Sequence, residues 1–189
     1  MDIIESMDAT VGVASAVIAN VGSDQLGAST PCTDWDVRAL LNHLIGGAYM
    51  VRDLGRDGQV DLAAMADDFV GSDPQAAWAE ASREATEAWR GDGVLAKTVT
   101  MPWGAQLPAP AALTILRNDL FQHSWDLARA TGQSTDLDAD VAADVWAAIQ
   151  ENPAGIDPFR QMGLFGPAVE VAGDAPLADR VAGYFGRTP

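Results

Sequence analysis

The residues best suited to chemistry in this sequence are two histidines and an aspartate. His43 and His123 are the only histidines among 189 residues, and each lies on or beside the apolar stripe of a predicted helix. Asp119 stands four residues before His123, so both side chains leave the same helix face one turn apart. Such a pair can bind a divalent cation with both side chains, and His43 from a facing helix would supply a third ligand. Two imidazoles and one carboxylate would leave coordination positions open for water or a substrate.

These residues also have structural interpretations. A lone helical histidine is usually a core or rim residue. An aspartate four residues before a histidine also occurs as a simple hydrogen-bonded pair or on a solvated face. A carboxylate buried on a helix face is costly unless it is paired or bound to a cation, which favours a metal site if Asp119 is buried. The spacing alone leaves both interpretations open.

Asp126 is the candidate catalytic residue, because it lies three residues beyond His123 on the same predicted helix. It can accept a hydrogen bond from a ligating imidazole and fix its tautomer, or act as an acid or base near the metal. The alternative is a surface ion pair with Arg117 or Arg129. Helix phase also brings Asn118 to this region, and the sequence does not rank these groups.

The single cysteine carries a weaker signal. Cys32 precedes the N-terminus of the predicted second helix, a position that can favour a thiolate. No basic residue is near it in sequence, and Asp34 and Asp36 oppose a negative sulfur. We therefore expect Cys32 to be an inert structural thiol. The sequence contains no Gly-rich phosphate loop and no Gly-x-Ser-x-Gly motif.

The charge balance excludes several classes of partner. Lys and Arg number 11 against 27 Asp and Glu, giving a net charge of −16. Such a surface repels nucleic-acid phosphates and anionic membranes. The apolar stretch 11–21 follows three acidic residues and is too short to span a bilayer. From the charge and the short apolar stretch we expect no nucleic-acid or membrane partner. One cysteine cannot form an internal disulfide, which fits a reducing compartment, so we expect a cytoplasmic protein.

Apolar residues recurring at steps of three and four predict five main helices that must position these groups. They cover about residues 2–22, 33–55, 72–90, 108–131 and 138–150, with Thr33 expected to cap the second. Gly46 and Gly47 in the second helix would let a neighbouring element approach closely. A hairpin is expected at 98–107, a short helical turn at 62–65, a short strand at 168–171 and a last helix at 177–185.

The elements together predict an all-α fold. We expect one domain over residues 1–189, a four-helix bundle with a short β-hairpin and an irregular C-terminal cover segment at 153–189.

Two segments of the sequence resemble the signature of the DinB-like metalloenzyme superfamily. In residues 30–44, TPCTDWDVRALLNHL, Trp35 opens the helix and His43 follows eight residues later. Residues 119–132, DLFQHSWDLARATG, look like the family's acidic-x-x-x-His-x-x-Asp-Leu-Ala helix. The closer resemblance is to the actinobacterial branch related to the metal-binding domain of mycothiol-dependent maleylpyruvate isomerase. Residues 165–167 and the pair Gly186 and Arg187 also resemble this branch.

The resemblance implies a DinB-like four-helix bundle with a metal at one end of its core. Carried over residue by residue, it makes His43, Asp119 and His123 the ligands of one divalent metal: zinc, with nickel or iron as alternatives. The sequence departs from the isomerase where Asp119 replaces a glutamate, which is longer by one methylene. That difference bears on metal choice and reaction. The residues after 153 are also too few for the isomerase's additional C-terminal domain.

The resemblance further implies a mycothiol-dependent transferase or isomerase in which the metal activates this low-molecular-weight thiol. Two other classes stay open. One is a non-catalytic module that binds a metal or small ligand, and the other is a metal-assisted hydrolase that uses water as its nucleophile. The expected partners are a small-molecule substrate and a thiol, and a homodimer is compatible with the sequence.

Overall fold

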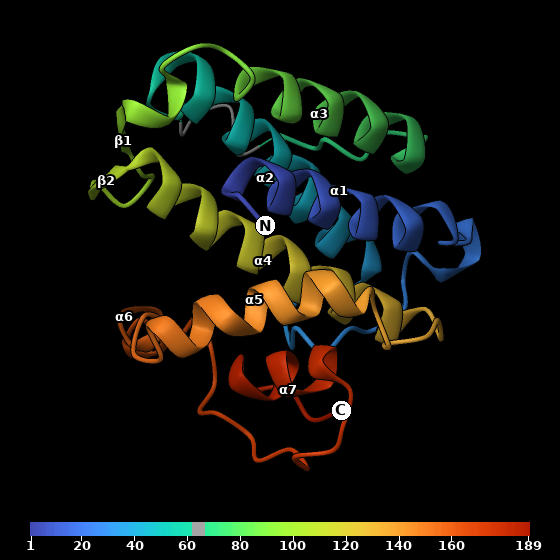
Figure 1. The fold of residues 1–189 in the computed structure, drawn as a ribbon. Helices are drawn as coiled ribbons and strands as arrows, with labels where there is room; N and C mark the ends of the chain where they lie inside the picture. The colour runs from blue at the N-terminus through green and yellow to red at the C-terminus, as the bar shows by residue number, and fades with distance from the viewer. Residues whose placement is uncertain (62–66) are drawn as a thin grey trace.

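A computed structural model describes residues 1–61 and 67–189, and it confirms the predicted all-α fold with one small hairpin (Figure 1). The main helices are α1 (Ile3–Ala19), α2 (Val37–Asp57), α3 (Pro74–Ala88), α4 (Ala109–Ala130), α5 (Ala139–Glu151), α6 (Asp157–Gln161) and α7 (Leu177–Tyr184). Short 3-10 turns form η1 (Ser23–Gln25) and η3 (Val94–Ala96). Strands β1 (Thr98–Thr100) and β2 (Gln106–Pro108) pair antiparallel, with Val99 opposite Leu107.

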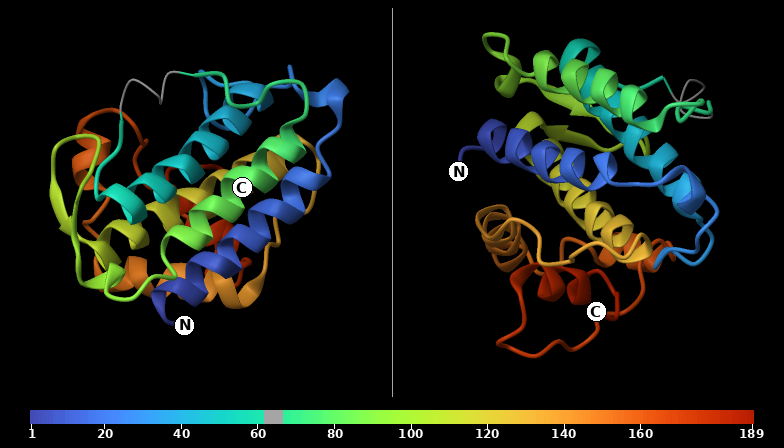
Figure 2. Two further views of the ribbon diagram at one scale, coloured as in Figure 1. Left: turned by 90° about the horizontal axis from the view of Figure 1, so that it is seen from above. Right: turned by 90° about the vertical axis from the view of Figure 1, so that its right-hand side faces the viewer.

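Four helices close into a bundle. Helix α1 packs on α3 and α4, and α2 packs on the same two helices, so the four contacts form a ring. Helices α5 and α7 contact each other and cover α4 on the side of the molecule opposite α3 (Figure 2). Helix α4 is therefore enclosed from both sides, and the eight successive residues 121–128 near its C-terminal end are all buried.

Aspartates cap the N-termini of α1, α2, α3 and α5. The Asp36 side chain accepts a hydrogen bond from the Ala39 backbone N–H at 2.8 Å and caps α2. The expectation that Thr33 caps this helix is wrong, because the chain is still in a loop there. Asp73 and Asp138 cap α3 and α5 in the same manner. A short acidic side chain suits this position because it satisfies free N–H groups and the positive end of the helix dipole.

Close packing of α2 on α3 occurs at Gly55. A Cβ atom there would lie 2.9 Å from the Ala88 carbonyl oxygen and 2.9 Å from Trp89 Nε1. The same indole N–H donates to the Val51 carbonyl at 2.8 Å, so the ring has no freedom to move away. At Gly47 a Cβ would meet nothing within 4 Å. Gly47 therefore makes no close contact of the expected kind, and the close approach seen at Gly55 lies two turns further along the helix.

The C-terminal segment differs most from the sequence-based expectations. Residues 168–171 form no strand, because Val169 uses its N–H on the Gly183 carbonyl at 2.9 Å and not on a neighbouring strand. Helix α6 was not predicted. Gly186 has a φ of 83°, and a Cβ there would lie 3.0 Å from the Gly166 oxygen. This glycine turn directs Arg187 back toward α4. The helical turn expected at 62–65 lies outside the described residues.

Within the described ranges, no helix is both long and apolar enough to cross a membrane.

Candidate metal centre

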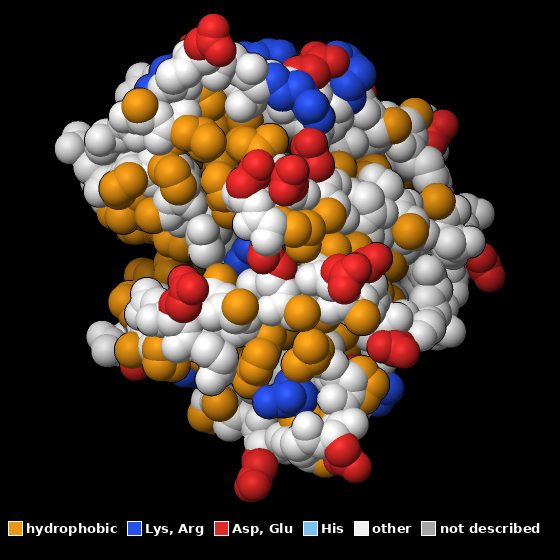
Figure 3. Space-filling view, in the orientation of Figure 1, with side chains coloured by type: hydrophobic (Ala, Val, Ile, Leu, Met, Phe, Trp, Pro, Cys, Tyr) orange, Lys and Arg blue, Asp and Glu red, His pale blue; other side chains and the backbone are white. Residues whose placement is uncertain are grey.

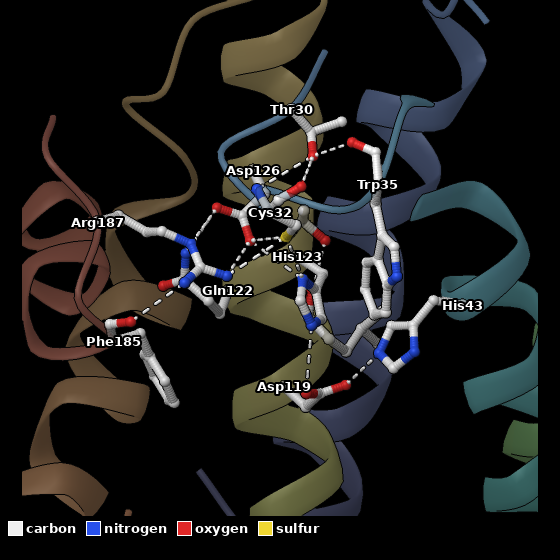
Figure 4. Close-up of polar contacts among 12 residues, drawn as sticks. Thr30, Cys32, Trp35, His43, Asp119, Gln122, His123, Asp126, Phe185 and Arg187 are labelled. Atoms are coloured by element: carbon white, nitrogen blue, oxygen red, sulfur yellow. Dashed lines mark hydrogen bonds and ion pairs between the residues drawn. The ribbon is translucent and has the colours of Figure 1, made fainter. Parts of the chain in front are cut away.

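The structure brings His43 from α2 against Asp119 and His123 from α4 (Figure 4). His43 Nε2 lies 3.1 Å from Asp119 Oδ2, and His123 Nε2 lies 3.4 Å from Asp119 Oδ1. One ligand atom from each residue can be chosen so that all three lie within 4.8 Å of one another. The i, i+4 spacing places the α4 pair on one face, and the packing of α2 on α4 supplies the third residue.

The donor set fits a divalent cation. Burial would raise the pKa of Asp119, but the facing imidazoles of His123 and His43 outweigh it and hold that pKa well below its usual value. Burial would lower the pKa of His123, but Asp119 and Asp126 raise it well above its usual value. Asp119 is thus an anion at neutral pH, placed where positive charge is favoured. Two imidazole nitrogens and one carboxylate oxygen are ligands that zinc and related metals accept.

Neighbouring side chains fix both imidazole rings. His123 Nδ1 lies 3.0 Å from Asp126 Oδ2, so Nδ1 is the nitrogen that donates to Asp126, and Nε2, which faces Asp119, is the nitrogen that a metal could bind in place of a proton. The ring of Trp35 lies 4.7 Å from that of His43 and 5.6 Å from that of His123, measured between centroids. Trp35 therefore supports both histidines from the loop before α2.

Asp126 is fully buried behind His123. It accepts hydrogen bonds from Arg187 Nε at 2.9 Å, Arg187 Nη2 at 3.1 Å and Gln122 Nε2 at 3.1 Å. Burial would raise the pKa of Asp126, but the hydrogen bonds from His123 and Arg187 lower it below its usual value. The alternative of a surface ion pair is wrong. The position suits the first interpretation, in which Asp126 orients the imidazole of His123.

Arg187 and Cys32 complete this buried cluster, and sequence reasoning did not connect them to it. Arg187 Nη2 donates to Cys32 Sγ at 3.3 Å, across 155 residues of chain, and the Cys32 thiol donates to Asp126 Oδ2 at 3.3 Å. A basic group does therefore lie beside Cys32, contrary to what its sequence neighbours indicate. In the sequence, the only feature that pointed to Arg187 was the resemblance of Gly186 and Arg187 to the isomerase branch.

A second set of possible ligands shares His123. Atoms of Cys32, His123 and Asp126 also lie within 4.8 Å of one another. The guanidinium of Arg187 already occupies this side, at hydrogen-bond distance from both Cys32 and Asp126. A cation here would be repelled by a fixed positive charge. The triad of His43, Asp119 and His123 is therefore the candidate metal centre.

The candidate metal centre lies in the wall of a cavity of about 790 Å³. Cys32, Trp35 and Arg187 line the same end, and side chains from α4, α5 and the segment 155–166 form the rest. In Figure 3 apolar side chains gather around a hollow between the β1–β2 hairpin and α6, at the left of the view. A volume of this size is typical of small-molecule sites.

Comparisons with known proteins identify the family and the fold of the chain. Residues 9–128 match the family model of the mycothiol maleylpyruvate isomerase N-terminal domain, a range that contains the whole triad and Asp126. Two uncharacterized proteins from two strains of Mycobacterium tuberculosis are each 35% identical over 178 residues, covering 92% of this chain and 91% of theirs.

The crystal structure of the mycothiol-dependent maleylpyruvate isomerase has a similar fold, with a TM-score of 0.57 at 14% identity over 70% of this chain and 61% of that one. A histidine-to-alanine mutant of that isomerase gives a TM-score of 0.52 at 15% identity, over 66% of this chain and 59% of the mutant's. The chain thus spans about three-fifths of the isomerase's length. Because the family model matches well over half of it, the chain belongs to the family of the mycothiol maleylpyruvate isomerase N-terminal domain.

Proposed function

We propose that this protein binds one divalent cation through His43, Asp119 and His123, and that it is a mycothiol-dependent transferase or isomerase. The observation that supports this most directly is the convergence of the three ligand side chains in the wall of a cavity of about 790 Å³. The family match adds the thiol, because the matching domain takes its name from a mycothiol-dependent enzyme.

The cation would be zinc, with nickel or iron as alternatives, and it would supply a Lewis acid that favours the thiolate form of a bound thiol at neutral pH. The chain's own residues provide the support. Asp126 keeps the proton of His123 on Nδ1, so that Nε2 can bind the metal. Arg187 balances the buried charge of Asp126 without entering the metal side of the ring. Asp126 is therefore proposed to act on the reaction by positioning His123.

The reactive sulfur is proposed to come from a diffusible thiol. The sulfur of Cys32 is committed to hydrogen bonds with Asp126 and Arg187, and it lies 3.7 Å from the Nδ1 atom of His123. That nitrogen is on the opposite edge of the ring from the Nε2 that faces Asp119. Cys32 is thus held away from the position where the three ligand atoms converge.

The hydrolase alternative uses the same metal centre, so the test must separate the two reactions. The first step is elemental analysis of untagged protein supplemented with metal. We expect about one divalent ion per chain, lost in the His43→Ala, His123→Ala double variant and kept in Cys32→Ser, the control for the competing ligand set. A stoichiometry near zero in the wild type, or unchanged in the double variant, would contradict the metal site.

The second step is a titration of the cobalt-loaded protein with mycothiol, followed by absorption spectroscopy. A thiolate-to-cobalt charge-transfer band is the expected result, and Asp119→Asn should weaken it by weakening the metal. If no low-molecular-weight thiol perturbs the cobalt spectrum, while hydrolysis of model esters or amides depends on the metal, the hydrolase is the correct reading. A metal that supports neither reaction would leave the non-catalytic binding module.

A further inference from the structure

We infer that the second substrate bound in the cavity beside the metal centre is an uncharged, apolar electrophile and not a carboxylate-bearing one. That the ligand is a second substrate rests on the proposed function, whereas the preference for an uncharged ligand rests on the cavity alone. The inference comes from the charges and the apolar surfaces that the cavity offers to a ligand.

The cavity has no free cationic side chain among the described residues that line it. Arg187 is the single Lys or Arg of this lining. Its Nε and Nη2 atoms donate to Asp126, Nη2 also donates to Cys32, and Nη1 donates to the Phe185 carbonyl at 3.3 Å. Its side chain is only 11% exposed. The guanidinium therefore has no pair of donors left for a substrate carboxylate.

Negative charge lines the same cavity. Asp34 and Asp119 both contribute to the lining. A cation on the triad would offset Asp119, but it would not provide a second positive group. A dicarboxylate such as maleylpyruvate would leave at least one carboxylate unpaired in this cavity, and burying an unpaired anion is costly.

The walls away from the triad are mainly apolar, with Thr114, Asn118 and Asn152 as uncharged polar members of the lining. Ile115 and Leu116 of α4 face this space together with Ile149 of α5. The ring of Trp103, from the hairpin turn, meets the ring of Phe159 of α6 edge to face at 5.4 Å between centroids. These groups offer a ligand dispersion contacts and few hydrogen bonds.

The rim of the cavity carries large apolar side chains that are exposed to solvent. Trp103 is 45% exposed, Met162 is 56% exposed and Leu164 is 63% exposed, and all three line the cavity. A cluster of this kind at the mouth of a cavity is typical of a binding site, because exposed apolar groups usually occur singly. Figure 3 shows the apolar surface continuing to the edge of the hollow. An uncharged ligand would bury both this rim and its own apolar surface.

A matched pair of fluorescent probes tests the inference. N-phenyl-1-naphthylamine is uncharged, and 8-anilino-1-naphthalenesulfonate has the same skeleton with one added sulfonate. Titrations use chelator-treated, metal-free protein in about 0.5 M salt, which screens the net charge of −16. We expect the uncharged probe to bind with a Kd at least about tenfold lower, equivalent to about 1.4 kcal/mol. Equal or tighter binding of the sulfonate would overturn the inference.

Two arginine substitutions test whether the probes bind in the cavity. Leu164→Arg adds a cation at the rim, at a position exposed enough to accept it without loss of packing. It should shift the preference toward the sulfonate by about tenfold. Leu95→Arg is the control, because Leu95 is 37% exposed and lies outside the cavity lining. If both variants shift the preference equally, the probes bind elsewhere and the inference fails. Because all titrations are metal-free, this result is independent of whether the metal and thiol are found.

Discussion

Asp126→Asn should be strongly destabilising, because it removes the negative charge that pairs with the guanidinium of Arg187 at a fully buried position. Asparagine has nearly the same shape, so the variant tests charge and hydrogen bonding, not packing. Its amide nitrogen would have to face a donor, since one carboxylate oxygen serves His123 Nδ1 and Arg187 Nη2 and the other serves Arg187 Nε and Gln122. The guanidinium of Arg187, which is only 11% exposed, would lose its counter-charge.

The size of the effect follows from the burial of both partners. Removing one member of a buried ion pair costs about 3–5 kcal/mol, because the remaining charge is left without a partner. For a domain of this size each kcal/mol lowers the Tm by about 2–4 °C, so the expected loss is on the order of 10 °C. The tautomer of His123 would also no longer be fixed. We therefore expect zinc affinity to fall by about 10–100-fold.

The two effects need separate measurements. Guanidinium chloride unfolding of the metal-free proteins gives the loss of stability, and competition with a zinc chelator gives the loss of affinity. Arg187→Met and the double variant complete a mutant cycle, in which a large coupling energy is expected because the partners touch. A loss below about 1 kcal/mol with no coupling and unchanged zinc affinity would refute the reasoning, since it would mean that the pair is solvated.

The remaining predictions concern the metal, the helix packing and a second ion pair. Chelation should lower the Tm and zinc at about 100 times its Kd should restore about 2.7 kcal/mol, measured by scanning fluorimetry; an unchanged Tm after confirmed metal loss would contradict the site. Gly55→Ala should cost about 1–3 kcal/mol in denaturant unfolding because its Cβ meets Ala88 and Trp89, whereas Gly47→Ala should be neutral or stabilising, and equal effects would refute the packing argument. Burial would raise the pKa of Asp144, but Ser6, the N-terminal amine and Arg117 lower it. The stabilising effect of the ionised Asp144 is therefore present above its unfolded pKa and is lost as pH falls through its folded pKa. In thermal melts at decreasing pH, the Asp144→Asn variant should therefore lose less stability than wild type below about pH 4.

The sequence predicted those parts of the site that local geometry controls. Asp119 and His123 lie four residues apart on one long helix, so their convergence follows from helical spacing. The contact of His43 with this pair depends on the packing of α2 against α4, which no local pattern encodes. From the residues alone His43 was a possible third ligand on a facing helix, and the resemblance, through the spacing of Trp35 and His43, assigned it to the site.

Features that depend on distant partners were missed. Arg187 lies 155 residues from Cys32 and reaches it through a glycine turn, so no periodicity connects the two. Residues 168–171 alternate in polarity as a strand does, but a strand needs a neighbour, and Val169 bonds to helix α7 instead. Helix α6 has five residues, which is too short to show a helical period.

The guanidinium of Arg187 joins three distant parts of the chain, because it lies between Cys32 of the loop before α2 and Asp126 of α4 while its own residue follows α7. The side of His123 that faces Asp126 is therefore closed by the last segment of the chain, three residues beyond the end of α7 at Tyr184. A proteolytic cut after α7 would remove this partner from Cys32 and Asp126, although His43, Asp119 and His123 all lie earlier in the chain.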